Sequence, residues 1–341
     1  MPINLKTFAD RLGLSQSTIS RALGDYQDVS PATREHVRRM ALELGYEPSR
    51  AARQTARGRT EAIGMIFSAS DDDFGNPHIL RTLAGLSTRL EARNYELQLA
   101  VTDPAGEMRA YERAVRTRSV DALIVAQTRC VDERIAYLAG TQMPFLAYGR
   151  TARPEGMAWF DFDAAAGSRL AVARLVELGH RRIAYVHHSF ALNYVRLCHA
   201  GFLAGMKKAE LQVAPQAVIE AFNTRQDGYM AGERLLALRP RPTAVIVDGN
   251  MSGFGLIRAL LDAGVAIGSE ISVVINGGIE GDLLPRGLSV AAIVQPTFYT
   301  TGEKLADMVL CLAQRRPLDE PRVLMKPQFL AGNSLGQAPA L

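Results

Sequence analysis

The sequence predicts an N-terminal all-α helix-turn-helix headpiece, followed by an α/β core of two doubly wound parallel-sheet lobes. Two observations predict this fold class. Short capped helix patterns fill the first 46 residues, and apolar runs alternate with helical patterns from residue 61. The 341 residues allow two or three domains, and 48% hydrophobic with 22% charged residues is ordinary for a globular protein. We place the headpiece at residues 1–47, a basic segment that is either a linker (hinge) or a short helix at 48–60, and the core at 61–341.

Three short helices are expected in the headpiece, each with a capping residue before it and a glycine after it. The caps and stops are Asn4 with Gly13, Ser15 with Gly24, and Ser30 with Gly45. Pro31 suits the first turn of the third helix. The apolar positions repeat at helical spacing and should form one small core of Phe8, Leu12, Ile19, Leu23, Val37 and Leu44.

The short turn Gly13-Leu14-Ser15 joins the first two helices as in a helix-turn-helix, whose second helix enters the major groove of DNA. The outward positions of the second helix are Gln16, Ser17, Ser20 and Arg21, which suit base edges and phosphates. A merely solvated helix face is the alternative. The charge favours DNA: residues 1–59 hold ten basic and six acidic residues, whereas the remainder holds 29 of each.

The core repeats a unit in which a short apolar run is followed by a polar loop and a helical pattern. Continuous apolar strands between helices are typical of parallel sheets that are covered on both faces. The expected strands are 62–67, 122–126, 144–148, 182–186, 243–247 and 271–275. The expected helices include 80–93, 168–178, 201–209, 228–238 and 253–263.

In such sheets ligands bind beyond the carboxyl ends of the strands. This rule nominates the polar residues that follow the apolar runs, any one of which could instead be an ordinary loop residue. They are Ser68, Asp71–Asp73, Gln127, Arg150, His187–His188, Asp248–Asn250 and Asn276–Gly278. Amides, imidazoles, carboxylates and an arginine suit a small hydroxyl-rich or mildly anionic ligand.

Several other classes of protein are disfavoured by the sequence. No apolar run is long enough to span a membrane, and the N-terminus does not resemble a secretory signal. Cys130, Cys198 and Cys311 are odd in number and far apart, as expected of reduced thiols in the cytoplasm. No dinucleotide fingerprint, phosphate-binding loop or nucleophile elbow is complete. We therefore expect a cytoplasmic, nucleoid-associated protein that is not an enzyme and needs no cofactor or metal.

Two N-terminal stretches resemble the lac-repressor (LacI/GalR) family of transcriptional regulators. They are NLKTFADRLGLSQSTISRAL at 4–23 and VSPATREHV at 29–37, followed by LGYEP at 44–48. The resemblance continues in the core through FGNP at 74–77, GHRRI at 179–183, EISVV at 270–274 and Gln295-Pro296. Its core in turn resembles periplasmic sugar-binding proteins. It implies an N-lobe of about 61–161 and 297–324 and a C-lobe of about 162–296 and 325–341.

The resemblance also implies roles for individual residues. The expected DNA contacts are Lys6, Ser15, Gln16, Ser17, Thr18, Arg21, Arg50, Arg53, Thr55 and Arg57. Thr55 stands where relatives carry the leucine of a hinge helix that wedges the minor groove. The expected effector contacts are Phe74, Gln127, Arg150, Phe162, His187, Arg196, Asp248, Asn276 and Gln295.

Some family positions differ in this chain. Cys198 replaces an arginine, Gly249-Asn250 replaces an Asn-Asp pair, and the Asn276-Gly277-Gly278 stretch lacks a customary aspartate. Glu270 stands where an aspartate is usual. The scaffold therefore carries over from the family, whereas the identity of the ligand does not.

The sequence thus predicts a transcriptional repressor whose affinity for DNA responds to a small-molecule effector, expected to be a carbohydrate. Its partners would be a near-palindromic double-stranded DNA operator and a second copy in a homodimer, with a tetramer as the alternative assembly. Two other hypotheses remain open at this point. One is a cytosolic sugar-binding or sugar-modifying protein with a degenerate headpiece, and the other is an architectural DNA-binding protein whose core only dimerises.

Overall fold

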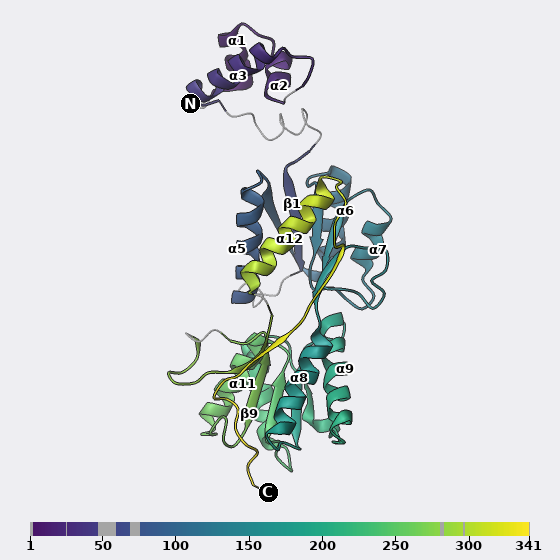
Figure 1. Cartoon of the computed structure of the whole chain (residues 1–341), viewed down its shortest axis with the longest axis vertical. Helices are drawn as coiled ribbons and strands as arrows, with labels where there is room; N and C mark the ends of the chain where they lie inside the picture. The colour runs from purple at the N-terminus through teal and green to yellow at the C-terminus, as the bar shows by residue number, and fades with distance from the viewer. Residues whose placement is uncertain are drawn as a thin grey trace.

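The chain folds into a helical headpiece and two α/β lobes that follow one another along an elongated molecule (Figure 1). The computed structural model describes residues 3–24, 26–46, 59–68, 76–279, 283–295 and 297–340. Most of the predicted hinge segment, including Arg50, Arg53, Thr55 and Arg57, lies outside the described residues, as does Phe74.

The headpiece contains the three predicted helices, α1 (Leu5–Leu12), α2 (Gln16–Leu23) and α3 (Pro31–Leu44). All three N-caps are confirmed, because the side chains of Asn4, Ser15 and Ser30 each accept a hydrogen bond from the backbone N–H three residues later. Of the predicted core, Phe8, Ile19 and Val37 are fully buried, and the three leucines lie half-buried at its edge. Tyr46 completes this core by stacking on Phe8, with ring centroids 4.3 Å apart.

The N-lobe is built on a six-stranded parallel sheet in the order β11-β5-β4-β3-β1-β2. Its strands are β1 (Ala62–Ser68), β2 (Glu96–Thr102), β3 (Ala122–Val125), β4 (Phe145–Tyr148), β5 (Trp159–Phe162) and β11 (Arg322–Met325). Helices α5 (Pro77–Glu91) and α12 (Phe298–Ala313) pack together over one face, whereas α6 (Glu107–Thr117) and α7 (Glu133–Ala139) cover the other. Each face therefore has its own apolar core, as the prediction of a doubly wound sheet requires.

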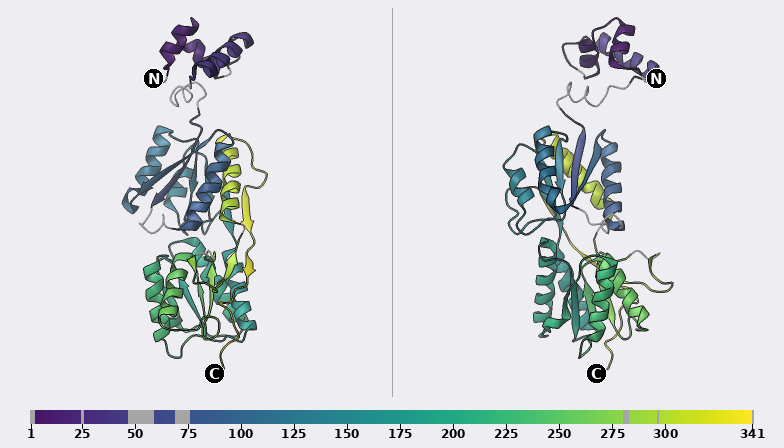
Figure 2. Two further views of the ribbon diagram at one scale, coloured as in Figure 1. Left: turned by 90° about the vertical axis from the view of Figure 1, so that its left-hand side faces the viewer. Right: turned by 180° about the vertical axis from the view of Figure 1, so that it is seen from behind.

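The C-lobe repeats this plan with a sheet in the order β12-β10-β9-β8-β6-β7, in which only the β10–β12 pair is antiparallel. Its strands are β6 (Ile183–His187), β7 (Val218–Glu220), β8 (Ala244–Val247), β9 (Ser272–Asn276), β10 (Ala291–Val294) and β12 (Gln328–Leu330). Helices α8 (Ala164–Glu177) and α9 (Asn193–Lys208) cover one face, and α10 (Arg225–Ala237) and α11 (Asn250–Asp262) the other (Figure 2).

All six predicted apolar runs are strands, but six further strands of the described chain were not predicted. Four of these, β2, β7, β11 and β12, lie at the sheet edges, and the other two are their neighbours β5 and β10. An edge strand buries only part of its surface and needs no continuous apolar run; β2, for example, alternates between exposed and half-buried residues. Hydrophobic pattern alone therefore identified only inner strands.

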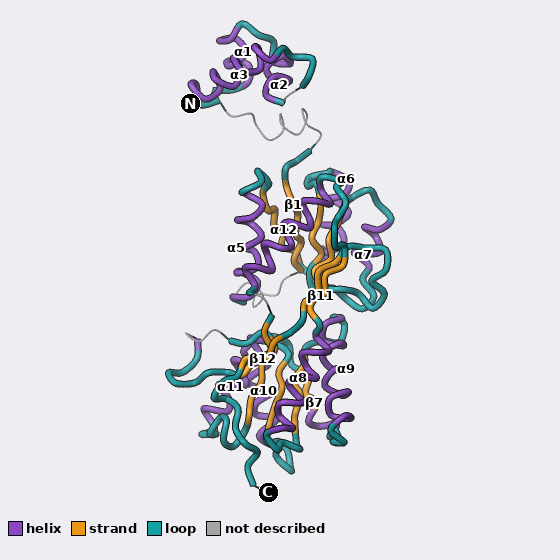
Figure 3. Tube along the Cα trace, in the orientation of Figure 1, coloured by secondary structure: helices purple, strands orange, loops and turns teal. Residues whose placement is uncertain are grey.

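The described chain passes between the two sheets after β5, after β10 and again between β11 and β12, and Figure 3 shows the last of these passages. The carboxyl ends of the parallel strands in both lobes consequently face the space between the lobes. No described helix has the length and apolar composition needed to cross a membrane.

Candidate functional site

The exposed face of α2 carries the polar side chains predicted to contact DNA. Ser15 Oγ accepts from the N–H of Thr18 at 3.0 Å and also shares hydrogen bonds with the hydroxyls of Ser17 and Thr18. Ile19 and Ala22 face the headpiece core, which leaves Gln16, Ser17 and Arg21 exposed on the opposite side. Lys6 is exposed on α1. The local cap therefore fixes which face of the helix is available to a partner.

Arg21 already has partners within the headpiece. Its guanidinium forms an ion pair with Asp28, and its central carbon lies 5.6 Å from the centroid of the Tyr26 ring. Both members of the ion pair are about half exposed, so the pair contributes little stability and a phosphate or base can replace the carboxylate. Asp28 and Tyr26 thus hold the side chain on which the predicted base contact depends.

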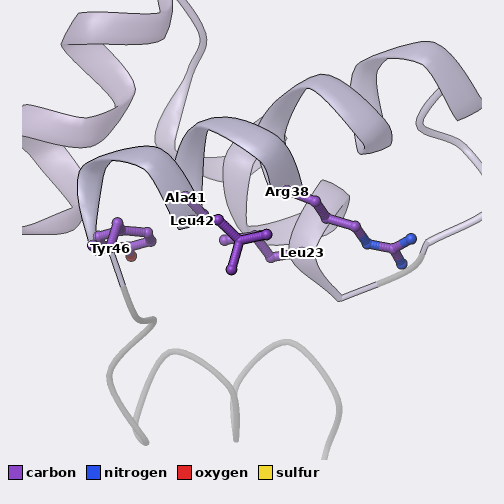
Figure 4. Close-up of a pocket in the computed structure, with 6 residues that line it drawn as sticks. Leu23, Arg38, Ala41, Leu42 and Tyr46 are labelled. Atoms are coloured by element: carbon purple, nitrogen blue, oxygen red, sulfur yellow. The ribbon is translucent and has the colours of Figure 1, made fainter.

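A second feature of the headpiece is an apolar hollow lined by Leu23, Arg38, Ala41, Leu42, Gly45 and Tyr46 (Figure 4). Leu42, in the last turn of α3, is 86% exposed. The hollow is mostly apolar, with the exposed Arg38 side chain at one side of it.

A cavity of about 300 Å³ lies between the two lobes, at the carboxyl ends of both sheets. Its wall is formed by residues that follow or end the strands and by the first turns of several helices. Five of the predicted effector residues line it: Gln127, Phe162, Asp248, Asn276 and Gln295.

Asp248 is the centre of a buried polar cluster on this wall. Its side chain accepts hydrogen bonds from the Tyr185 hydroxyl and from Asn276 Nδ2, the latter at 2.6 Å. Asn276 Nδ2 also lies 3.7 Å from the sulfur of Cys198. Burial raises the pKa of Asp248 to about 7, although hydrogen bonds from Tyr185, Asn276 and Cys198 oppose the rise. Burial also raises the pKa of the Cys198 thiol, so the cluster gains no thiolate at neutral pH.

Aromatic rings supply the apolar part of the wall. Phe162 packs edge-on against Phe160 and Tyr148, with centroids 5.3 and 6.4 Å away. Phe298 stacks on His78 at a centroid distance of 3.9 Å. Burial and then the nearby Arg81 lower the pKa of His78 to about 4, so its ring is neutral at physiological pH. The cavity therefore offers aromatic surface next to hydrogen-bonding groups.

A reciprocal amide pair joins the lobes at the cavity. Asn76, the cap of α5 in the N-lobe, donates to Asn250 Oδ1 at 3.1 Å, and Asn250 at the start of α11 donates back to Asn76 Oδ1 at 2.8 Å. Both side chains are buried. Asn223 Oδ1 supports Asn250 by accepting from the N–H groups of Met251 and Ser252. The two bonds between Asn76 and Asn250 connect residues that are 174 positions apart in the sequence.

The structure does not place three predicted effector residues on the cavity wall. Arg150 forms an ion pair with Asp161, with Nε 2.8 Å from the carboxylate, and its guanidinium lies over Trp159. His187 is buried and stacked on Phe190, with centroids 4.1 Å apart. Arg196 Nε donates to the backbone carbonyl of Phe190 at 2.8 Å. Each of the three side chains contacts another part of the protein instead of the cavity. The position of a residue after a strand does not show whether such a partner is within reach.

Other wall residues were missed by the sequence reasoning. Asn76, His78, Asn223 and Phe298 stand at or just before the starts of helices, and all line the cavity. Asn223 follows an apolar stretch before α10, a signal that could have nominated it. Among the described residues no cluster of three or more metal-ligating side chains occurs.

Comparison with known proteins identifies relatives along the whole chain. A model of bacterial regulatory proteins of the lacI family matches residues 4–49, and a model of periplasmic binding protein-like domains matches residues 172–335. The chain is 34% identical over 334 residues to the HTH-type transcriptional regulator RafR of Escherichia coli, with 98% of each chain covered. It is 29% identical over 341 residues to the regulator AglR of Rhizobium meliloti (strain 1021), covering 99% of this chain and 96% of the relative.

Solved structures share the fold. A transcriptional regulator from Yersinia pestis biovar Microtus is 38% identical with a TM-score of 0.75, covering 82% of this chain and 99% of the other. The lac repressor dimer bound to operator and the anti-inducer ONPF superposes with a TM-score of 0.82 over 100% of both chains, at 24% identity. The complex of the transcriptional regulator CelR with cellobiose has a TM-score of 0.74 at 23% identity, covering 97% and 99%.

Proposed function

This chain belongs to the lacI family of bacterial regulatory proteins and is a DNA-binding transcriptional regulator, and from that premise we propose that a carbohydrate effector in the cavity between its lobes controls its operator affinity. The observation that carries the proposal is that one cavity is lined by residues of both lobes. A ligand bound there contacts both lobes at once. Its differential affinity for their closed and open arrangements can therefore shift the balance between them.

The chemistry of the wall favours a carbohydrate. Phe162 and Phe298 offer aromatic surface for the apolar face of a sugar ring, and amides and carboxylates around them can bind hydroxyl groups. CelR, which shares this fold, was solved with cellobiose. We test the site by titrating neutral mono- and disaccharides into the full chain by calorimetry. Phe162→Ala should lower the affinity for the sugar at least tenfold. Tyr137→Ala, which removes a half-buried ring of α7, should leave this affinity unchanged.

An unchanged sugar affinity in Phe162→Ala would move the effector site away from this cavity. Sugar binding that leaves operator affinity unaltered would contradict its role as an effector. We expect a repressor, so in-vitro transcription from a promoter that carries the operator should fall when the protein is added and respond to the sugar.

Specific DNA contacts come from the exposed face of α2, with Gln16 and Arg21 reading base edges and Ser17 and Lys6 holding the backbone. Gln16→Ala or Arg21→Ala should cost ~1–3 kcal/mol on an operator selected from random-sequence duplexes and less on unrelated DNA. Arg39→Ala is the matched control, because it removes an exposed headpiece arginine from α3. Equal weakening on both kinds of DNA would show that Gln16 and Arg21 contact only phosphates.

The operator is near-palindromic and the regulator binds it as a homodimer, since one headpiece makes few base contacts. The edge strand β2 supports dimerisation: Leu99 and Val101 are 44% and 58% exposed there, and the neighbouring α5 exposes Leu80. Leu99→Glu should shift sedimentation velocity towards the monomer. Leu324→Glu, on the opposite edge strand β11, should not. Wild-type protein that sediments as a monomer would refute the dimer. A species with twice the mass of the dimer would establish the tetramer.

A further inference from the structure

We propose that the cavity between the lobes selects an uncharged, hydroxyl-rich ligand over phosphorylated or carboxylated counterparts, and that Asp248 is the residue which enforces this choice. The inference rests on the proposed effector site and concerns the charge of its ligand. It follows from the ionisable groups on the wall. Asp161, Asp163 and Asp248 line the cavity, and none of its described lining residues is a lysine or an arginine.

The cationic groups near the wall are already used elsewhere. Arg150 is paired with Asp161, and Arg196 donates to a backbone carbonyl. The pKa of His78 is lowered to about 4, so this histidine of the wall supplies no charge at neutral pH. The other, His188, accepts a hydrogen bond at Nδ1 from the N–H of Ser189. An anionic ligand would therefore meet Asp163 and Asp248 on a wall whose described residues include no lysine or arginine.

The adjoining sequence adds no positive charge. Residues 69–75 and 280–282, which lie outside the described part of the chain, contain Asp71, Asp72, Asp73, Glu280 and Asp282 and no lysine or arginine. Both stretches directly precede or follow elements that contribute wall residues.

Helix N-termini could in principle attract an anion, because five helices begin at the cavity. Four of them are capped by the protein's own side chains. The caps are Asn76 for α5, Asp163 for α8, Asn223 for α11 and Thr297 for α12. The fifth, α9, has no side-chain cap, but the N–H of Asn193 at its start donates to the carbonyl of Thr128. Each of these helices thus has at least one of its first-turn N–H donors already occupied.

Asp248 is the strongest determinant because it is only 5% exposed and has no cationic partner among its hydrogen-bonding neighbours. A carboxylate in such a place can accept further hydrogen bonds from ligand hydroxyls. Above its pKa of about 7 this carboxyl is ionised, and it then repels a second negative charge nearby far more strongly than an exposed carboxylate would. The wall is therefore matched to neutral donors of hydrogen bonds.

The test uses the full chain and matched sets of probes at pH 8.5, above the pKa of Asp248, with binding measured by thermal shift and calorimetry. The sugar sets are glucose, galactose, maltose and cellobiose, each with its 6-phosphate and the corresponding uronate. Adenine with AMP and hypoxanthine with IMP form the non-sugar sets. For every set that binds, the neutral member should bind on the order of 100-fold more tightly than its charged counterparts.

Two wall variants test the cause of the selectivity. Asp248→Asn, which is isosteric, should reduce the ratio of affinities for the neutral and charged members at least tenfold. Gln295→Lys, which adds a cation to the wall, should reduce this ratio further. Asp319→Asn, which changes an exposed carboxylate in the loop before β11, should leave it unchanged. A charged member that binds wild-type protein as tightly as its neutral counterpart overturns the proposal. If Asp248→Asn and wild type show the same affinity ratio, Asp248 is not the residue that enforces the selection.

The outcomes also separate this inference from the proposed function. Binding confined to adenine or hypoxanthine, with the nucleotides rejected, would refute a carbohydrate effector and the preference for a hydroxyl-rich ligand, and would support only the selection against charge. Binding of a sugar 6-phosphate alone would support the carbohydrate and overturn the charge selection. Absence of any binding overturns both.

Discussion

Asp248 should make the stability of the core depend on pH in a predictable direction. Because its pKa is raised by burial to about 7 from the ordinary value of 3.8, the folded protein favours the neutral carboxyl. Its contribution to stability is therefore fully present below about pH 4 and is lost as the pH rises towards 7. Above that pH the loss is complete and the contribution is constant.

The size of the effect follows from the two pKa values. Each unit by which the pKa differs between the folded and unfolded states corresponds to ~1.4 kcal/mol. The rise from 3.8 to about 7 therefore amounts to at most ~4 kcal/mol in the free energy of unfolding. Asp248→Asn keeps the shape of the side chain and removes the ionisation. The variant should accordingly gain stability over the wild type as the pH increases, even where it loses a constant amount through altered hydrogen bonding.

The assay is urea-induced unfolding of the core between pH 4.5 and 8.5, with the wild type and variant measured in the same buffers. Because part of the effect already lies below pH 4.5, we expect the difference in the free energy of unfolding to move by up to ~3 kcal/mol in favour of the variant across this range and to level off above about pH 7. Asp319→Asn serves as the control, because its carboxylate is exposed in the loop before β11. A difference between Asp248→Asn and wild type that stays constant across this range would refute the reasoning.

Three further predictions concern the amide pair between the lobes, the headpiece and the hinge segment. Asn76→Ala and Asn250→Ala should show a coupling energy of ~1–3 kcal/mol in a double-mutant cycle of unfolding, because two amide hydrogen bonds are shared, and strictly additive effects would contradict the bridge. Asp28→Asn should release Arg21 and strengthen binding to operator and random DNA by up to ~1 kcal/mol in fluorescence anisotropy at low salt, and unchanged affinity would mean that the carboxylate does not compete with DNA. Thr55→Leu, a change outside the described residues, should raise both operator affinity and DNA bending in an energy-transfer assay. The salt dependence of operator binding should stay nearly constant. If neither affinity nor bending rises, this segment only tethers the headpiece.

The headpiece and the inner strands could be predicted because their signals are local. Ser15 caps α2 through a bond to a residue three positions away, and Gly13 ends α1 in the left-handed conformation, so neighbouring residues suffice to define both ends. The buried runs in β1 and β8 are apolar along their whole length because both faces of each sheet are covered. The family resemblance then placed these elements in the right fold.

The composition of the cavity was decided by tertiary structure. The sequence by itself determined that polar residues follow the strands, and five of the predicted effector residues do line one cavity. It did not determine which side chains face inward. Arg150 turns to Asp161, and Asn76 reaches Asn250 from 174 residues away. A polar side chain chooses among all the charges and hydrogen-bonding groups within its reach, and most of these come from distant parts of the chain. Residue type and strand position therefore predict where a site lies, whereas only the packed lobes decide which groups form it.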